Sequence, residues 1–170
     1  MNTRHTVIDT PLGELTLVAD ADELIGLYFP HHWYRPAADT FGGRVNADSD
    51  GLLAEAHSQL DDFLAGERWH FDLPIRLRGD HTQRRIWDRL TTIPYGETVT
   101  YGDLADGLAD GTTAQEVGAA VGRNPISIVV PCHRVVGKNG KLTGYAGGLA
   151  RKQFLLDLEE PAGIRAARLF

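Results

Sequence analysis

The chain has 170 residues, 42% of them hydrophobic, so it is long enough to bury a core as one domain or two small ones. Its longest apolar runs span only a few residues, far fewer than a membrane crossing requires. The N-terminus shows no charged segment followed by an apolar stretch, so we expect no secretory signal and a cytoplasmic protein. A single cysteine excludes an internal disulfide and a multi-cysteine metal site.

The net charge of −6 argues against a nucleic-acid partner for the chain as a whole, but the charge is unevenly distributed. Residues 1–80 carry 6 Lys and Arg against 14 Asp and Glu, whereas residues 81–170 carry 11 against 9. No acidic residue occurs over 117–156. The basic residues of that stretch are Arg123, Arg134, Lys138, Lys141, Arg151 and Lys152. The pattern predicts a local basic patch on an otherwise acidic protein.

The N-terminal segment predicts an antiparallel meander of three short strands. These strands are expected over 6–9, 15–19 and 25–29, where apolar residues alternate with others. Turn clusters at 11–13 and 20–22 separate them.

Residues 30–51 are rich in His, Pro, Gly, Asp and Asn without any period, so we expect an irregular connection there. A helix is predicted over 52–64, because apolar residues recur on one helical face and Gly66 can end it. A strand over 70–77 follows. Residues 1–80 are therefore expected to form a small α/β domain.

The second half of the chain shows helical segments separated by short breaks. A helix is predicted over 82–93, and Thr100 and Thr113 each begin a capping-box pattern that opens a further short helix. Two short helices around a tight turn containing Gly form a helix-turn-helix pattern. This pattern is typical of DNA-binding proteins, but it also occurs in helical hairpins that bind nothing.

Two further elements are expected after this pair. The Asn-Gly dipeptide within 138–141 favours a hairpin, and a last helix is predicted from Leu149 to about Glu159. The predicted fold class is an α/β N-terminal domain with a small antiparallel sheet, residues 1–80, followed by a mostly helical C-terminal domain, residues 81–170, that contains a winged helix-turn-helix.

The second helix of the pair carries an unusual run of small residues, Gly118, Ala119, Ala120 and Gly122, which we expect to be exposed. Two glycines in one helix cost about 1 kcal/mol each relative to alanine. One interpretation is close packing of another helix. The other is entry into the DNA minor groove, which is only about 6 Å wide.

The only cysteine stands between a proline and two basic residues, in the order Pro131, Cys132, His133, Arg134. A lone cysteine is often just a small buried apolar residue. Neighbouring positive charge or a hydrogen-bonded histidine would instead lower the thiol pKa and make it a nucleophile. In extended chain adjacent side chains point to opposite sides, so a water would have to connect His133 to the sulfur. An orienting carboxylate would come from the last helix: Asp157, Glu159 or Glu160.

Three segments carry a specific resemblance. They are NPISIVVPCHRVV at Asn124–Val136, GYAGGLARK at Gly144–Lys152 and IPYGETVTYGDLA at Ile93–Ala105. Together they resemble the O6-alkylguanine-DNA alkyltransferases, densely over residues 82–160 and in general outline before that. The Pro-Cys-His-Arg core at this spacing from the Gly-Tyr segment is highly specific.

The resemblance implies an activity and a role for each catalytic residue. Cys132 would accept an alkyl group from O6 of guanine, irreversibly and once per molecule, without a cofactor. His133 would act through a water while Glu159 holds it, and Asn124 would support the surrounding loops. O4-alkylthymine is an alternative lesion.

The resemblance also implies how DNA is held. Tyr145 would hydrogen-bond a flipped base, the backbone near Val135 and Ala146 would contact the base edge, and Tyr101 would push on a phosphate. The predicted DNA-facing residues are Tyr101, Gln115, Gly118, Ala119, Val121, Arg123, Arg134, Val135, Tyr145, Ala146 and Lys152. The expected partner is double-stranded alkylated DNA bound through its minor groove by a monomer, with cooperative binding left open, and no membrane.

The sequence departs from the family pattern at Gln115 and at Thr82, where an aromatic residue is common in the family. Gln115 stands where the family has an arginine that fills the gap left by the flipped base, so weaker DNA binding is expected. Some relatives hold zinc through N-terminal cysteines that this chain lacks, so we expect no metal site, and His31 and His32 are interpreted as loop histidines.

Other functions remain open at this stage. A cysteine hydrolase would usually place its histidine far from the cysteine in sequence. A protein that only binds alkylated DNA, a helix-turn-helix regulator, or an alkyltransferase for an unusual adduct would also fit a chain carrying Gln115. Taken singly, Tyr101, Tyr145 and Glu159 could be a helix cap, a core aromatic and a surface carboxylate. Their joint spacing around one cysteine favours alkyl transfer.

Overall fold

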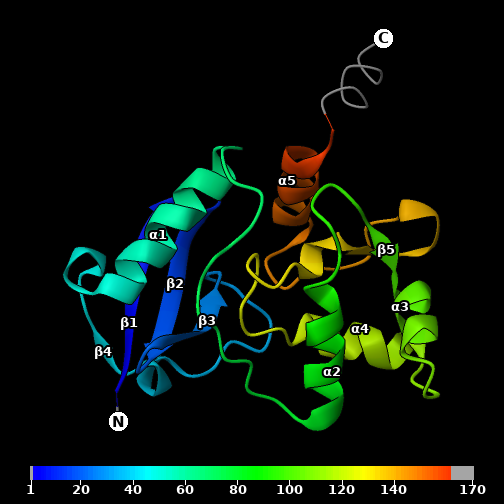
Figure 1. Ribbon diagram of the computed structural model, residues 1–170, viewed down its shortest axis with the longest axis horizontal. Helices are drawn as coiled ribbons and strands as arrows, with labels where there is room; N and C mark the ends of the chain where they lie inside the picture. Colours follow the sequence, from blue (N-terminus) through cyan, green and yellow to red (C-terminus); the bar gives the residue numbers. More distant parts are fainter. Residues whose placement is uncertain (1, 162–170) are drawn as a thin grey trace.

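The computed structural model describes residues 2–161 of the chain, so the end of the predicted C-terminal domain, 162–170, lies outside the described residues. Figure 1 shows a sheet with one long helix on one side of the molecule and a group of shorter helices on the other. None of the described helices is long and apolar enough to cross a membrane.

The described chain contains α-helices, β-strands and short 3-10 helices, the last labelled η. In chain order the elements are β1 (Thr3–Thr10), β2 (Gly13–Asp20), β3 (Glu23–Tyr28), η1 (Ala38–Phe41), β4 (Gly43–Arg44), η2 (Ala47–Ser49), α1 (Gly51–Leu64), α2 (His81–Leu90), β5 (Val99–Thr100), α3 (Tyr101–Leu108), α4 (Ala114–Gly122), η3 (Cys132–Arg134), β6 (Val135–Val136), η4 (Lys138–Gly140) and α5 (Leu149–Glu159).

The N-terminal half is built on a four-stranded sheet with the order β3-β2-β1-β4. The β1–β2 and β2–β3 pairs are antiparallel, which confirms the predicted meander. Strand β1 is longer than expected, because pairing with β2 continues out to Thr3 opposite Asp20. The connection expected to be irregular contributes the short strand β4, which pairs with β1 in parallel, and otherwise the turns η1 and η2.

Helix α1 covers one face of this sheet (Figure 1). The alternating residues Leu15 and Leu17 of β2 and the regularly spaced Leu60 and Phe63 of α1 are fully buried in the same hydrophobic core. The side chain of Asp50 caps the helix by accepting the N–H of its third residue. The apolar residues that alternate along the strand and those that recur on one face of the helix thus pack in one layer, as the sequence predicts.

The strand predicted over 70–77 is wrong. The segment makes only one isolated bridge to β3. Pro74, in its middle, has no N–H to donate to a neighbouring strand. The side chain of Gln59 on α1 takes the place of such a strand, because it accepts the N–H of Asp72 at 2.8 Å and donates to the carbonyl of the same residue at 3.0 Å.

The predicted helices of the C-terminal half are present as α2, α3, α4 and α5. Thr100 caps α3 and Thr113 caps α4, each hydroxyl accepting an N–H three residues later, from Asp103 at 3.0 Å and Glu116 at 3.1 Å. The Thr113 hydroxyl also donates to the Glu116 carboxylate at 3.3 Å. The sequence patterns at both threonines therefore mark the starts of two adjacent helices (Figure 1).

The hairpin predicted at 138–141 lacks paired strands. β6 instead pairs in parallel with β5, and the Asn-Gly pair lies in the turn η4. Asn139 and Gly140 do adopt the positive φ angles of 63° and 78° that such a pair favours. The N–H of Gly137 donates to the carbonyl of Lys141 at 2.7 Å and closes the loop.

The N-terminal sheet is joined directly to the loops around the cysteine. The N–H of Leu27 in β3 donates to the carbonyl of Pro125 at 2.9 Å. Just after β3, the Phe29 ring packs against Tyr145 with ring centroids 5.7 Å apart. The Phe29 ring also lies close to the backbone of Gly147. A Cβ atom at that residue would be 2.6 Å from the ring, so only glycine leaves room for it. The two halves share one core, and the sheet helps to position the loops on either side of Cys132.

Candidate active site

Cys132 begins a tight turn rather than ending an extended strand. It is the first residue of the 3-10 helix η3, which corrects the expected extended geometry. Successive side chains in such a turn are about 120° apart. Cys132 therefore lines a pocket of about 460 Å³, while His133 and Arg134 contact α5. The thiol is only 2% exposed.

Asn124 shapes the loop that precedes the cysteine, as the resemblance implies. Its side-chain amide donates to the carbonyl of Val130 at 2.8 Å, and its side-chain oxygen accepts the N–H of Ile126 at 3.0 Å. Between these anchors Ile128 has a positive φ of 72°, an uncommon conformation for a β-branched residue. Strain of this kind persists only where the surrounding contacts determine the conformation, and the buried Asn124 provides them.

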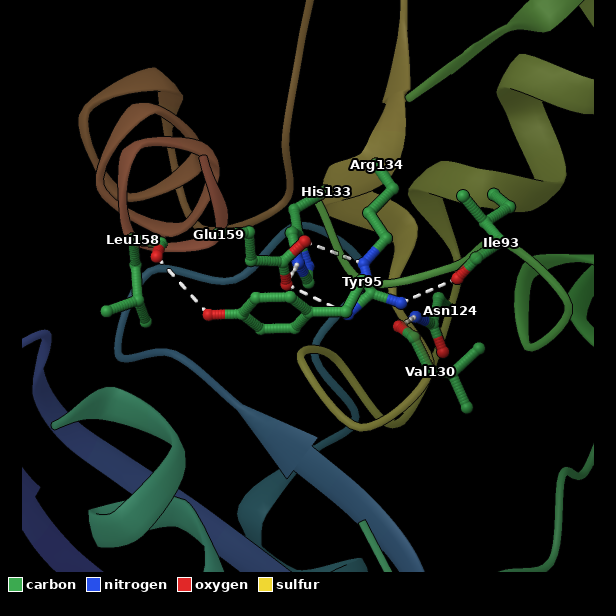
Figure 2. Close-up of polar contacts among 8 residues, drawn as sticks. All are labelled: Ile93, Tyr95, Asn124, Val130, His133, Arg134, Leu158 and Glu159. Carbon is green, nitrogen blue, oxygen red and sulfur yellow. Dashed lines mark hydrogen bonds and ion pairs between the residues drawn. The ribbon is translucent and has the colours of Figure 1, made fainter. Parts of the chain in front are cut away.

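His133, Arg134 and Glu159 form a buried polar cluster (Figure 2). The Nε2 atom of His133 lies 2.7 Å from Oε2 of Glu159. Arg134 donates to both carboxylate oxygens, from Nε at 2.7 Å and from a terminal nitrogen at 2.9 Å. Of the three carboxylates considered on the last helix, Glu159 is the one that contacts His133.

Burial and pairing act in opposite directions on the charges of this cluster. Burial would raise the pKa of Glu159, but hydrogen bonds from His133 and Arg134 outweigh it and lower that pKa to about 2. Burial lowers the pKa of His133, against the pull of Glu159. Since Arg134 already balances the Glu159 charge, the imidazole is neutral and donates its Nε2 proton to the carboxylate.

Arg134 was predicted to face DNA, and this assignment is wrong. Its guanidinium also donates to the carbonyl of Ile93 at 2.7 Å and lies over the Tyr95 ring, 5.6 Å from the centroid. The Tyr95 hydroxyl donates to the carbonyl of Leu158 at 3.2 Å (Figure 2). Every one of these contacts ties the cysteine turn to α5 or to the loop after α2, away from the surface.

Lys152 is likewise not a surface residue. Its side chain is fully buried on α5, and Nζ donates to the carbonyls of Val135 at 2.6 Å and Gly144 at 3.0 Å. Burial lowers the pKa of Lys152 to about 8. With Arg134 and Lys152 both inside the protein, the predicted basic patch is reduced, which corrects the expectation from charge counts.

Tyr145, Ser127 and Cys132 are buried beside one another, and their side chains interact. Within residues 2–161, neither hydroxyl makes a hydrogen bond of ordinary geometry, and Nδ1 of His133 has no partner. Burial raises the pKa of Tyr145 well above 10 and also raises the pKa of the Cys132 thiol. Cys132 is therefore a neutral thiol near neutral pH, and Tyr145 is a neutral hydrogen-bond donor.

Helices α3 and α4 form the opposite rim of the pocket. Tyr101, Gln115, Gly118 and Val121 line it, and Val121 is buried rather than exposed. Ala119 faces solvent, whereas Ala120 is buried and accepts the indole N–H of Trp87 at 2.8 Å, so the predicted exposed run is interrupted there. The backbones of Val135 and Ala146 lie in buried segments beside the cysteine.

Sequence patterns missed Trp33. It follows β3 in the segment without periodicity, and it is 50% exposed while lining the same pocket as Cys132. The neighbouring Tyr34 ring lies under the exposed Arg123 guanidinium, 3.9 Å from its centroid. Two adjacent aromatic residues were the only signal, and nothing in the sequence linked them to the cysteine.

Comparison with known proteins identifies the family. The family described as 6-O-methylguanine DNA methyltransferase matches twice, with its ribonuclease-like domain over residues 3–77 and its DNA-binding domain over residues 81–161. A methylated-DNA–protein-cysteine methyltransferase of Mycobacterium tuberculosis is 45% identical over 92% of each chain. The constitutive one of Bacillus subtilis is 39% identical, covering 91% of this chain and 94% of its own.

A solved structure agrees with these sequence matches. The crystal structure of Mycobacterium tuberculosis OGT in complex with DNA shares 43% identity with this chain, covers 92% of both and superposes with a TM-score of 0.83. The arrangement of an N-terminal sheet domain and a helical C-terminal domain is thus shared with it. The chain belongs to the 6-O-methylguanine DNA methyltransferase family, whose members are methylated-DNA–protein-cysteine methyltransferases.

Proposed function

We propose that this protein reverses O6-alkylguanine damage by moving the alkyl group from duplex DNA onto Cys132. The single observation that carries the proposal is the Cys132 thiol at a 460 Å³ pocket, beside a His133 that is oriented by a buried Glu159. A metal site is not needed for this chemistry, and no group of His, Cys, Asp and Glu residues suited to a metal occurs within residues 2–161.

His133 acts as the base for the thiol. Its Nε2 proton is engaged by Glu159, so Nδ1 is the free acceptor, and it takes the thiol proton through a bridging water. The sulfur forms a bond to the alkyl carbon while that carbon's bond to O6 breaks. Guanine leaves with one proton returned from the site, so the products are a thioether and normal guanine. No ordinary reductant restores the thiol, and each molecule reacts once.

Access to the alkyl carbon requires the nucleotide to leave the base stack. Tyr145 then donates its hydroxyl to the flipped base, and the backbone of Val135 and Ala146 contacts the base edge. Within residues 2–161 this buried hydroxyl has no hydrogen bond of ordinary geometry, which makes it available to a bound base.

The helices α3 and α4 act as a winged helix-turn-helix that binds duplex DNA by its minor groove. Gly118 and Ala119 offer a surface without bulk for this groove. Tyr101 and Gln115 line the pocket from the same helices, where they meet the flipped nucleotide and the gap it leaves. The solved Mycobacterium tuberculosis structure is a complex with DNA, which supports this partner. Three expectations stay predictions: a domain boundary after residue 80, a monomeric protein and a cytoplasmic location.

Intact-protein mass spectrometry tests the proposal. After mixing with a duplex that contains one O6-methylguanine, the protein should gain the mass of one methyl group on the Cys132 peptide, up to one methyl per molecule. The Cys132→Ser protein and an unmodified duplex are the controls. Unchanged mass with retained lesion binding would identify a recognition protein instead, and several turnovers per molecule would identify a hydrolase.

A further inference from the structure

We propose that Trp33, from the N-terminal half, determines specificity at this site by contacting bulky apolar substituents on the guanine. The inference rests on the proposed function, because it concerns the adducts that the same pocket accepts. It adds a residue outside the C-terminal motifs, in a segment whose sequence shows no periodicity.

Trp33 lines the pocket opposite α4. Its backbone N–H donates to the carbonyl of Ala146 at 3.3 Å, next to Tyr145. The tip of its ring lies against Gly144, where a Cβ atom would be 3.2 Å from the indole. A Cβ atom at residue 144 would require the ring to move by a few tenths of an ångström, so the glycine allows the indole to pack closely on this backbone.

The neighbouring residue holds Trp33 in place. Tyr34 has a positive φ of 54° and packs its ring under the Arg123 guanidinium at the end of α4. The loop after β3 is therefore attached to both rims of the pocket, to α4 through Tyr34 and to the Gly144–Ala146 segment through Trp33. Because the loop that carries it is anchored at two points, the Trp33 indole has a defined position at the edge of the pocket.

The position of the indole selects the kind of substituent it can contact. Cys132 is 2% exposed and Trp33 is 50% exposed, so we infer that the sulfur lies at the inner end of the shared pocket and the indole nearer its opening. A methyl group in line with the sulfur lies at the inner end and does not reach the indole. A benzyl group has the same reacting carbon, but its ring must extend away from the sulfur.

The volume of the pocket agrees with this distinction between a methyl and a benzyl substituent. A volume of about 460 Å³ falls within the range that accepts drug-sized molecules, larger than a base with one methyl group. The half-exposed indole offers the additional aromatic surface that a benzyl ring would bury.

Single-turnover rate constants for duplexes carrying O6-methylguanine or O6-benzylguanine test the inference. We expect Trp33→Ala to slow benzyl transfer about tenfold, the size of one lost aromatic contact, and to change methyl transfer by less than about twofold. Trp33→Phe should retain most of the benzyl rate. Phe154→Ala is the control, since Phe154 is 37% exposed on α5 and does not line this pocket.

Each result has a distinct meaning. If both rates fall alike, if neither changes, or if benzyl transfer becomes faster, Trp33 does not supply this contact. Trp33→Leu, with its melting temperature measured, repeats the test should the alanine variant be unstable. Failure of the unmodified protein to take up a methyl group would instead refute the proposed function itself.

Discussion

The two sides of the Cys132–Arg134 turn differ in how their polar groups are satisfied. On the α5 side, Glu159 receives hydrogen bonds from His133 and Arg134 on its two carboxylate oxygens (Figure 2). Around Cys132, the buried hydroxyls of Tyr145 and Ser127 lie near each other and near the thiol, but within residues 2–161 they make no hydrogen bond of ordinary geometry. The same short segment thus separates a charged network with short hydrogen bonds from a group of neutral side chains with weak contacts.

This difference separates the groups that stabilise the site from the groups that recognise the ligand. A buried charged network with short hydrogen bonds fixes a conformation and stabilises it. A buried hydroxyl without a well-formed hydrogen bond costs up to about 1–3 kcal/mol, and its presence is explained when a ligand supplies a better partner. The α5 side should therefore dominate the stability of the site, and the pocket side should dominate recognition.

The largest effect is expected from Glu159→Gln. The amide cannot balance the buried Arg134 charge, so the free energy of unfolding should fall by about 3–5 kcal/mol. Alkyl transfer should slow by about 10²-fold or more, because His133 loses the group that orients it. Urea unfolding and single-turnover kinetics measure the two quantities. Asp157→Asn, an exposed carboxylate on the same helix, is the control, and an equal effect there would contradict the assignment.

A dependence of stability on pH should accompany this ion pair. The folded pKa of Glu159, about 2, lies below its ordinary 4.5. A depressed carboxyl pKa stabilises the folded state fully above the ordinary value, and the contribution is lost as pH falls from about 4.5 toward 2. It amounts to about 3 kcal/mol. Unfolding curves of the native protein and of Glu159→Gln should converge over that pH range, and parallel curves would contradict the prediction.

Tyr145→Phe should separate recognition from stability. Loss of the hydroxyl removes one hydrogen bond to the flipped base, so transfer should slow about threefold to tenfold. Because the hydroxyl makes only weak contacts with Ser127 and Cys132, the free energy of unfolding should change by less than about 1 kcal/mol. Slower transfer together with a larger loss of stability would show that the hydroxyl acts mainly on the folded structure.

Sequence patterns predicted the parts of this molecule that depend on local order. The meander, α1 and the threonine caps follow from spacing alone, and the Cys132–His133 neighbourhood follows from one motif. The strand over 70–77 was wrong because a distant glutamine side chain replaces its partner strand.

Long-range contacts also explain the errors in the site. Arg134 and Lys152 were assigned to DNA because charge does not reveal burial. Their partners, Glu159 and the carbonyls of Val135 and Gly144, are distant in sequence or on the backbone. No motif could place the Trp33 loop beside Cys132, because tertiary folding alone brings the two together.

The smallest effect concerns Gln115, on the pocket rim that we propose faces DNA. It is exposed at the start of α4 and lines the pocket, at the position where the family resemblance implies an arginine. An arginine there would add one positive charge near phosphates, so Gln115→Arg should tighten binding to duplex DNA about threefold and increase its sensitivity to salt. Fluorescence titration at two salt concentrations measures both, with Gln153→Arg on exposed α5 as the control. Since Arg134 and Lys152 are buried, they do not take the place of the added charge. Equal or weaker binding would show that residue 115 does not lie near DNA phosphates in the complex.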